Sequence, residues 1–158
     1  MKNKIIMLLI IVLITGCNKE NKITCVRTEE YTRYYVEHII EPDKEIGDNP
    51  NEVGANIVNK REYYLKSNGI GVKRIIETLE INFIIDTDMT KQLIYYNSGC
   101  DNINDQYKTC KVTQNGNRIT IIAELNLNST DYKEIVKSLT KDEILDSSVD
   151  ENGKCVEK

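Results

Sequence analysis

The chain has 158 residues, with 25 Asp and Glu against 21 Lys and Arg, and its formal net charge is −4. This acidic balance argues against nucleic acid as a partner, because proteins that bind nucleic acid present basic patches to its phosphates. It also argues against direct adhesion to anionic lipid head groups, which attract basic segments.

The first 17 residues have the order of an export signal. Lys2 and Lys4 precede ten apolar residues at positions 5–14, and two small residues then lead to Cys17. A helix needs about 20 apolar residues to cross a bilayer, whereas a signal peptide has an apolar region of about 7–15. The pattern predicts a signal peptide over residues 1–16 and not a permanent membrane helix.

The four residues that end at Cys17 resemble the lipobox of bacterial lipoproteins, an aliphatic residue and two small residues before a cysteine. This resemblance implies that the Cys17 sulfur carries a diacylglycerol and that residues 17–22 form a lipidated tether. Two acyl chains give stable anchoring, because each buried CH₂ contributes about 0.8 kcal/mol. The expected partner is the lipid bilayer, at the outer face of the cell membrane, or the outer membrane in a cell with two membranes.

The mature chain is the size of one domain. Removal of residues 1–16 leaves 142 residues with a net charge of about −6, because that segment holds two lysines and no acid. A chain of this length can bury a sizeable core. We expect a single extracytoplasmic domain over residues 23–158.

Four further cysteines occur, Cys25, Cys100, Cys110 and Cys155. An even count in an exported domain suggests two disulfides. Three pairings are possible, and free thiols are the alternative. We favour Cys25 with Cys155, near the two ends of the mature chain, and Cys100 with Cys110. Chain entropy would then stabilise the fold by about 4–5 kcal/mol through the long loop and about 2–3 kcal/mol through the short one.

The first half of the domain has strand character. Residues 22–41 are rich in β-branched and aromatic residues and predict one broken or two short strands, with Tyr34, Val36, His38 and Ile40 alternating on one face. Residues 42–59 hold both prolines and predict a loop or insertion. Strands are expected again at 61–66 and 72–85, joined by a turn that contains an Asn-Gly step.

The second half mixes helices with strands. An N-cap at residues 86–88 and apolar side chains at helical spacing predict an amphipathic helix. Its apolar face is Met89, Leu93, Tyr96, Cys100, Ile103 and Tyr107. A second Asn-Gly hairpin joins strands at 109–113 and 118–127. A short helix at 129–140 and a last one, which begins with a capping box at Thr140 and ends near Asn152-Gly153, complete the order.

This order of elements resembles the small YehR-like lipoproteins of bacteria, a family of unknown function. The matching motifs are the lipobox at Cys17, Ile23-Thr24-Cys25, a cysteine at the end of the central helix with a second in the next strand, Asn115-Gly116-Asn117-Arg118-Ile119, and Gly153-Lys154-Cys155. The resemblance covers nearly the whole mature chain apart from the insertion at 42–59. It implies an α+β fold, with helices on one face of an antiparallel sheet, and no known reaction.

No arrangement in the sequence points to catalysis. His38 is the only histidine and has no second histidine or reactive cysteine beside it to build a base-activated nucleophile. Glu77 with Glu80, or Asp86 with Asp88, could nominally supply the paired carboxylates of a hydrolase, which needs one raised pKa in a cleft. We expect no catalytic residue, no metal ligand and no cofactor.

The nine tyrosines include three adjacent pairs, Tyr34-Tyr35, Tyr63-Tyr64 and Tyr95-Tyr96. Neighbouring residues of a strand point to opposite faces. Tyr31 or Tyr35, with Tyr63 or Tyr64, could therefore line an exposed sheet face that stacks on a sugar or packs a peptide. The alternative is cross-strand pairing that only stabilises the sheet, by about 0.2–1 kcal/mol per pair.

The sequence thus predicts a membrane-anchored extracytoplasmic lipoprotein with a non-catalytic binding or interaction domain. Its partner would be an unidentified envelope protein, glycan or small molecule. A structural or assembly-assisting envelope lipoprotein is the first alternative, and a carboxylate-based hydrolase is the second.

Overall fold

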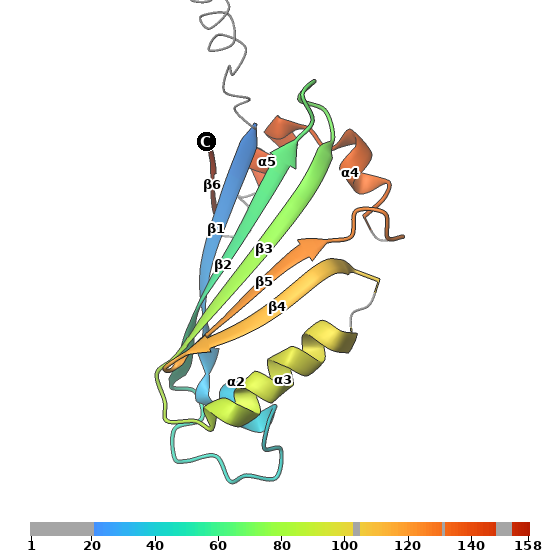
Figure 1. Cartoon of the computed structure of the whole chain (residues 1–158). Coiled ribbons are helices and arrows are strands. Elements are labelled where there is room, and N and C mark those ends of the chain that lie inside the picture. The colour runs from blue at the N-terminus through green and yellow to red at the C-terminus, as the bar shows by residue number, and fades with distance from the viewer. Residues whose placement is uncertain (1–20, 103–104, 131, 148–152) are drawn as a thin grey trace, which may run out of the picture.

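The computed structural model describes residues 21–102, 105–130, 132–147 and 153–158. Their strands form one antiparallel sheet of six strands in the order β4-β5-β3-β2-β1-β6 (Figure 1). The strands are β1 (Lys22–Thr32), β2 (Val53–Leu65), β3 (Val72–Phe83), β4 (Tyr107–Asn115), β5 (Arg118–Leu125) and β6 (Lys154–Glu157). The described helices are α2 (Arg33–His38), α3 (Met89–Asn102), α4 (Ile135–Ser138) and α5 (Lys141–Ser147). The expected α+β class is confirmed, with more sheet than helix. The predicted signal peptide and Cys17 lie outside the described residues.

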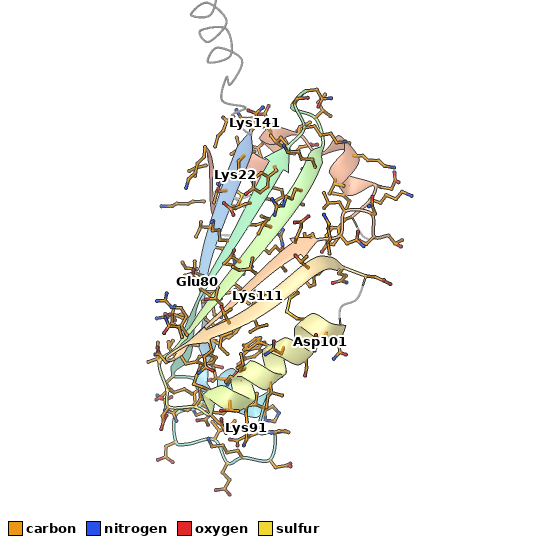
Figure 2. The ribbon with its side chains drawn as sticks, viewed as in Figure 1. Lys22, Glu80, Lys91, Asp101, Lys111 and Lys141 are labelled. Atoms are coloured by element: carbon orange, nitrogen blue, oxygen red, sulfur yellow. A yellow bond between two sulfur atoms is a disulfide. The ribbon has the colours of Figure 1, made fainter. Side chains whose placement is uncertain are left out.

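The odd-numbered residues of the central strands share one face of the sheet, which is the face that the helices cover. Ile57 of β2 lies opposite Ile81 of β3, and Ile81 lies opposite Ile119 of β5. These three side chains are at most 1% exposed. The even-numbered face carries charged side chains instead, such as Glu80, which lies 3.8 Å from Arg118 (Figure 2). The alternation follows from the period of two residues in a strand.

The core is divided into two clusters at opposite ends of the sheet (Figure 1). The α2–α3 cluster is built on Val36, Ala55, Ile57, Ile81, Phe83 and Ile119. The α4–α5 cluster is built on Ile23, Leu65, Val72, Ile75, Leu125, Val136 and Ile144. Each pair of helices therefore covers its own end of the same sheet face.

The predicted strand around Tyr34 to Ile40 is wrong, because the chain forms helix α2 there. The Thr32 side chain caps this helix by accepting a hydrogen bond from the Tyr35 backbone N–H at 3.2 Å. The turn of the helix places Val36 in the α2–α3 cluster, where it is 1% exposed. Burial and the cap thus override the weak strand preference of these residues.

The predicted loop over 42–59 is too long, because β2 already begins at Val53. The segment up to residue 52 is tied to α2. The backbone N–H groups of Arg33 and Tyr34 donate to the carbonyls of Glu52 and Pro50, at 2.7 and 3.1 Å. Strand β2 pairs with β1 and β3 on its two sides, so ladder hydrogen bonds hold residues whose local composition favours a loop.

Both predicted Asn-Gly hairpins form, and the first makes a close contact with α4. Gly69 and Gly71 have φ angles of 73° and 81°, which favour glycine. A Cβ on Gly71 would lie 2.8 Å from the carbonyl oxygen of Lys137. Glycine at position 71 therefore lets the β2–β3 hairpin approach the backbone of α4.

The C-terminal part differs from the sequence prediction in three places. Helix α3 ends at Asn102, and Tyr107 already belongs to β4. The helix expected over 129–140 is reduced to α4. The capping box at Thr140 is confirmed, since its N–H donates to the Glu143 carboxylate at 2.7 Å. Helix α5 spans Lys141–Ser147, and the expected helix end near Asn152 lies outside the described residues. Strand β6 occupies Lys154–Glu157, where no strand was expected.

Both favoured disulfides are present in the structure. Cys25 of β1 lies directly opposite Cys155 of β6, and the bond joins these strands across a sequence separation of 130. Cys100 of α3 is bonded to Cys110 of β4, across a separation of 10. One bond therefore fastens the C-terminal strand to the sheet, and the other fastens α3 to the edge strand β4.

Candidate ligand-binding site

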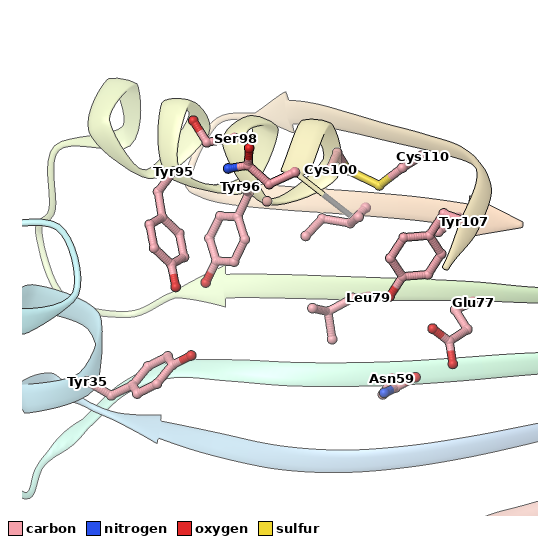
Figure 3. Close-up of a pocket in the computed structure, with 14 residues that line it drawn as sticks. Tyr35, Asn59, Glu77, Leu79, Tyr95, Tyr96, Ser98, Cys100, Tyr107 and Cys110 are labelled. Atoms are coloured by element: carbon pink, nitrogen blue, oxygen red, sulfur yellow. A yellow bond between two sulfur atoms is a disulfide. The ribbon is translucent and has the colours of Figure 1, made fainter. Parts of the chain in front are cut away.

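A cavity of about 520 Å³ lies between α3 and the odd-numbered face of the sheet (Figure 3). It is lined by Tyr35, Asn59, Glu77, Leu79, Tyr95, Tyr96, Ser98, Gly99, Cys100, Asn102, Tyr107, Cys110, Ile121 and Ala123. Pockets that bind small molecules measure about 300–1,000 Å³ and combine apolar walls with a few polar groups. This cavity has the size and the mixed lining of such a pocket.

A cap fixes the start of α3, and two contacts with other elements hold the helix over the sheet. Asp88 caps its N-terminus by accepting hydrogen bonds from the N–H groups of Thr90 and Lys91, at 3.0 and 3.2 Å. The buried Gln92 side chain donates to the Val36 carbonyl of α2 at 3.0 Å. The Cys100–Cys110 disulfide holds the other end, with its two Cα atoms 5.5 Å apart. Helix α3, which forms one wall of the cavity, is therefore held near both of its ends.

Tyrosines form one end of the cavity. Tyr35 comes from α2, and Tyr95 and Tyr96 come from α3, with their hydroxyl ends directed toward the same space (Figure 3). The rings of Tyr95 and Tyr96 meet edge to face, with centroids 5.1 Å apart. Burial and the nearby hydroxyls of Tyr31 and Tyr35 raise the pKa of Tyr96. The Tyr96 phenol is consequently neutral at physiological pH.

Polar groups from the sheet form the other end, around an ion pair. The Glu77 carboxylate pairs with Arg61, the residue directly opposite it on β2. Arg61 also donates to the hydroxyl of Tyr63 at 3.3 Å. Burial, followed by the nearby Glu77 carboxylate, raises the pKa of Tyr107. Its phenol, like that of Tyr96, stays protonated and can donate as well as accept a hydrogen bond.

The structure separates the four tyrosines that the sequence nominated. Tyr35 lines the cavity, and Tyr31 packs beside it with ring centroids 4.2 Å apart. Tyr63 lies about 26 Å from Tyr31 along the sheet, because Tyr63 pairs with Ile23 of β1, eight residues before Tyr31 on that strand. Tyr64 is on the even-numbered face, where Lys22 and Arg74 lie 5.8 and 5.4 Å from its ring centroid. The four do not form one surface.

Sequence reasoning did not nominate most of the cavity lining. The sequence predicts Tyr96 and Tyr107 on the apolar face of a helix, Tyr95 only as the neighbour of Tyr96 in a tyrosine pair, and Asn59 in a loop. One feature of the sequence did indicate the site. Tyr96 and Cys100 share the predicted apolar face of the helix, and a disulfide from Cys100 to Cys110 holds that face against the sheet.

The structure also separates the nominated carboxylate pairs. Glu77 faces the cavity from the odd-numbered side of β3, whereas Glu80 lies on the opposite face near Arg118. Asp88 is occupied as the cap of α3, and Asp86 is exposed. Neither pair presents two carboxylates to one cleft. His38 lies on α2, where its ring stacks on Tyr34 with centroids 4.7 Å apart.

Comparison of the chain with protein-family models, curated proteins and solved structures gives no match. Across the part of the chain that the structure describes, none of the helices has both the length and the apolar character needed to cross a membrane.

Proposed function

We propose that this chain is a membrane-anchored extracytoplasmic lipoprotein whose domain binds a small molecule in the cavity beneath α3. The observation that carries the proposal is the cavity itself, in which an apolar floor meets convergent phenol, amide and carboxylate groups. The proposal assigns no catalytic step to these residues. Membership of the YehR-like lipoproteins remains a prediction from the sequence motifs.

The anchor is supported by the export pattern that ends at Cys17 and by the two disulfides, which are typical of domains outside the cytoplasm. Strand β1 begins at Lys22, at the end of the sheet that α4 and α5 cover, and runs about 35 Å to the end that α2 covers. In an anchored protein the tether joins the α4–α5 end, and the end of the cavity formed by Tyr35, Tyr95 and Tyr96 lies toward the far end.

We expect Cys17→Ala to abolish acylation, because the thiol that would carry the diacylglycerol is gone. Cells fed a labelled fatty acid should yield labelled parent protein in the membrane fraction and unlabelled variant outside it. Asn18→Ala is the matched control and should keep the label. Labelling of the Cys17→Ala protein equal to that of the parent would contradict the anchor.

We expect Gly99→Trp to block the cavity without unfolding the protein. Gly99 lines the cavity and is exposed, and a Cβ built on it meets no atom within 4 Å, so a larger side chain begins there without a clash. Replacing a glycine inside a helix also removes a cost of about 1 kcal/mol. With ¹⁹F-labelled tyrosines, a fragment mixture should shift the resonances of Tyr35, Tyr96 and Tyr107 in the parent but not in the variant.

The control for this experiment is Ile94→Trp, which adds the same side chain to the same helix at a position that is 61% exposed and does not line the cavity. This variant should respond to fragments as the parent does. Fragment shifts that persist in Gly99→Trp, or a parent protein in which no fragment shifts any cavity tyrosine, would remove the proposed site.

A further inference from the structure

The charge of the cavity restricts what it can bind. Among the lining residues, all of which belong to the described part of the chain, Glu77 alone carries a formal charge. Its carboxylate is already paired with Arg61. A charged ligand would lose hydration on entry and would find no unpaired counter-charge inside. The cavity therefore favours a neutral ligand.

The polar lining groups favour a ligand that both donates and accepts hydrogen bonds. The phenols of Tyr35, Tyr95, Tyr96 and Tyr107 each have one donor and can also accept. The amide of Asn59 offers both roles as well. Hydroxyl groups on the ligand match such a lining better than a pure acceptor or a pure donor does.

The apolar lining favours a ligand with a flat hydrocarbon face. Leu79, Ile121 and Ala123 form an aliphatic floor on the sheet, and the tyrosine rings provide aromatic walls. Tyrosine presents an apolar ring together with a polar tip, so one side chain can contact C–H groups and bond a hydroxyl. A pyranose ring has this division, with C–H groups on its faces and hydroxyls around its edge.

We propose that the cavity binds a neutral sugar, with the pyranose C–H face on the aromatic and aliphatic lining and its hydroxyls bonded to the phenols and Asn59. This inference rests on the proposed function, in which the cavity is a ligand site. An organic ammonium would suit aromatic rings beside a free carboxylate. Here Arg61 occupies that carboxylate, so the cavity discriminates against a cation.

The test is a ¹⁹F NMR titration of the full chain in a polyoxyethylene detergent, because a sugar-based detergent would compete. The probes are glucose, glucosamine and glucuronate, which share one ring but are neutral, cationic and anionic. Glucose should shift the resonances of the cavity tyrosines, and each charged analogue should bind at least about tenfold more weakly, a difference of about 1.4 kcal/mol. A further titration with cellobiose, a neutral disaccharide of glucose, should show the same shifts at lower concentration.

Arg61→Gln tests the reason for this preference, because it leaves the Glu77 carboxylate without its partner. Glucosamine should then bind more tightly than glucose. Arg118→Gln, on the opposite face, is the control and should keep the order of the parent. Charged analogues that bind the parent as tightly as glucose would overturn the inference. The inference would also be overturned if neither glucose nor cellobiose shifted the resonances of the cavity tyrosines while the fragment mixture did. In that case the cavity would be a ligand site of another class.

Discussion

The double variant Cys25→Ser/Cys155→Ser should lose about 4–5 kcal/mol of unfolding free energy, the largest effect that we expect from any change in this chain. The disulfide closes a loop with a sequence separation of 130, so its removal gives the unfolded chain far more freedom. The bond also holds β6, a strand of four residues at the edge of the sheet whose one neighbour among the described strands is β1. Urea unfolding followed by tyrosine fluorescence measures the loss.

The Cys100→Ser/Cys110→Ser variant is the matched control, because it removes a disulfide of separation 10. Its expected loss is about 2–3 kcal/mol. Hydrogen exchange should become faster at Lys154 to Glu157 in the first variant and at the C-terminal end of α3 in the second. Equal losses, or a larger loss for the short loop, would contradict the chain-entropy account.

Phe83→Ala should lose about 3–5 kcal/mol, the range found when a buried phenylalanine is truncated. Phe83 is the only phenylalanine in the sequence and is 2% exposed. It lies in the α2–α3 cluster with Val36 and Ile81, where its ring joins the sheet to α2. Truncation would leave a cavity among the buried side chains of this cluster.

The control for Phe83→Ala is Ile135→Ala on α4, where the isoleucine is 61% exposed and should lose less than about 0.5 kcal/mol. Hydrogen exchange should separate the two ends of the sheet, with faster exchange in α2 and α3 and little change around Ile144. A loss below about 1 kcal/mol for Phe83→Ala would mean that the α2–α3 cluster contributes little to stability.

The elements that were predicted correctly are those whose determinants lie within a few residues. The Asn-Gly steps bring their own turn chemistry, Asp88 caps α3 through N–H groups two and three residues away, and Thr140 and Glu143 bond to each other. The disulfides are an exception, since Cys25 and Cys155 are 130 residues apart, and they could be predicted because four cysteines allow only three pairings. In the turns and caps, both partners of the interaction lie within three residues of each other.

The elements that were missed depend on residues far away in the chain. Helix α2 forms where β-branched and aromatic residues favour a strand, because Val36 packs on the sheet and Arg33 bonds to Glu52 at 2.6 Å. The first half of β2 is held by neighbours on both sides. Strand β6 follows the expected end of the last helix, where the sequence predicts no strand, and it forms through its pairing with β1 around Cys25. None of these contacts can be predicted from the local propensities of the residues involved.

The cavity could not have been predicted from the sequence for the same reason. Its lining comes from α2, α3 and four strands, and it exists because the two core clusters leave part of the covered face unfilled. Which tyrosine lines it depends on helix orientation. Tyr35 enters the site only because α2 is a helix, while Tyr64 is turned to the other face by the register of β2.

The bond between Cys25 and Cys155 also determines how the domain responds to mechanical load. A pull on the N-terminus acts first on β1, which lies between β2 and β6. Only Lys22, Ile23 and Thr24 precede the covalent bond at Cys25, so the strand can peel by three residues before the force passes into β6. When the two ends of the chain are pulled apart, the bond carries the load beyond that point, and stretching cannot extend the 129 residues between Cys25 and Cys155.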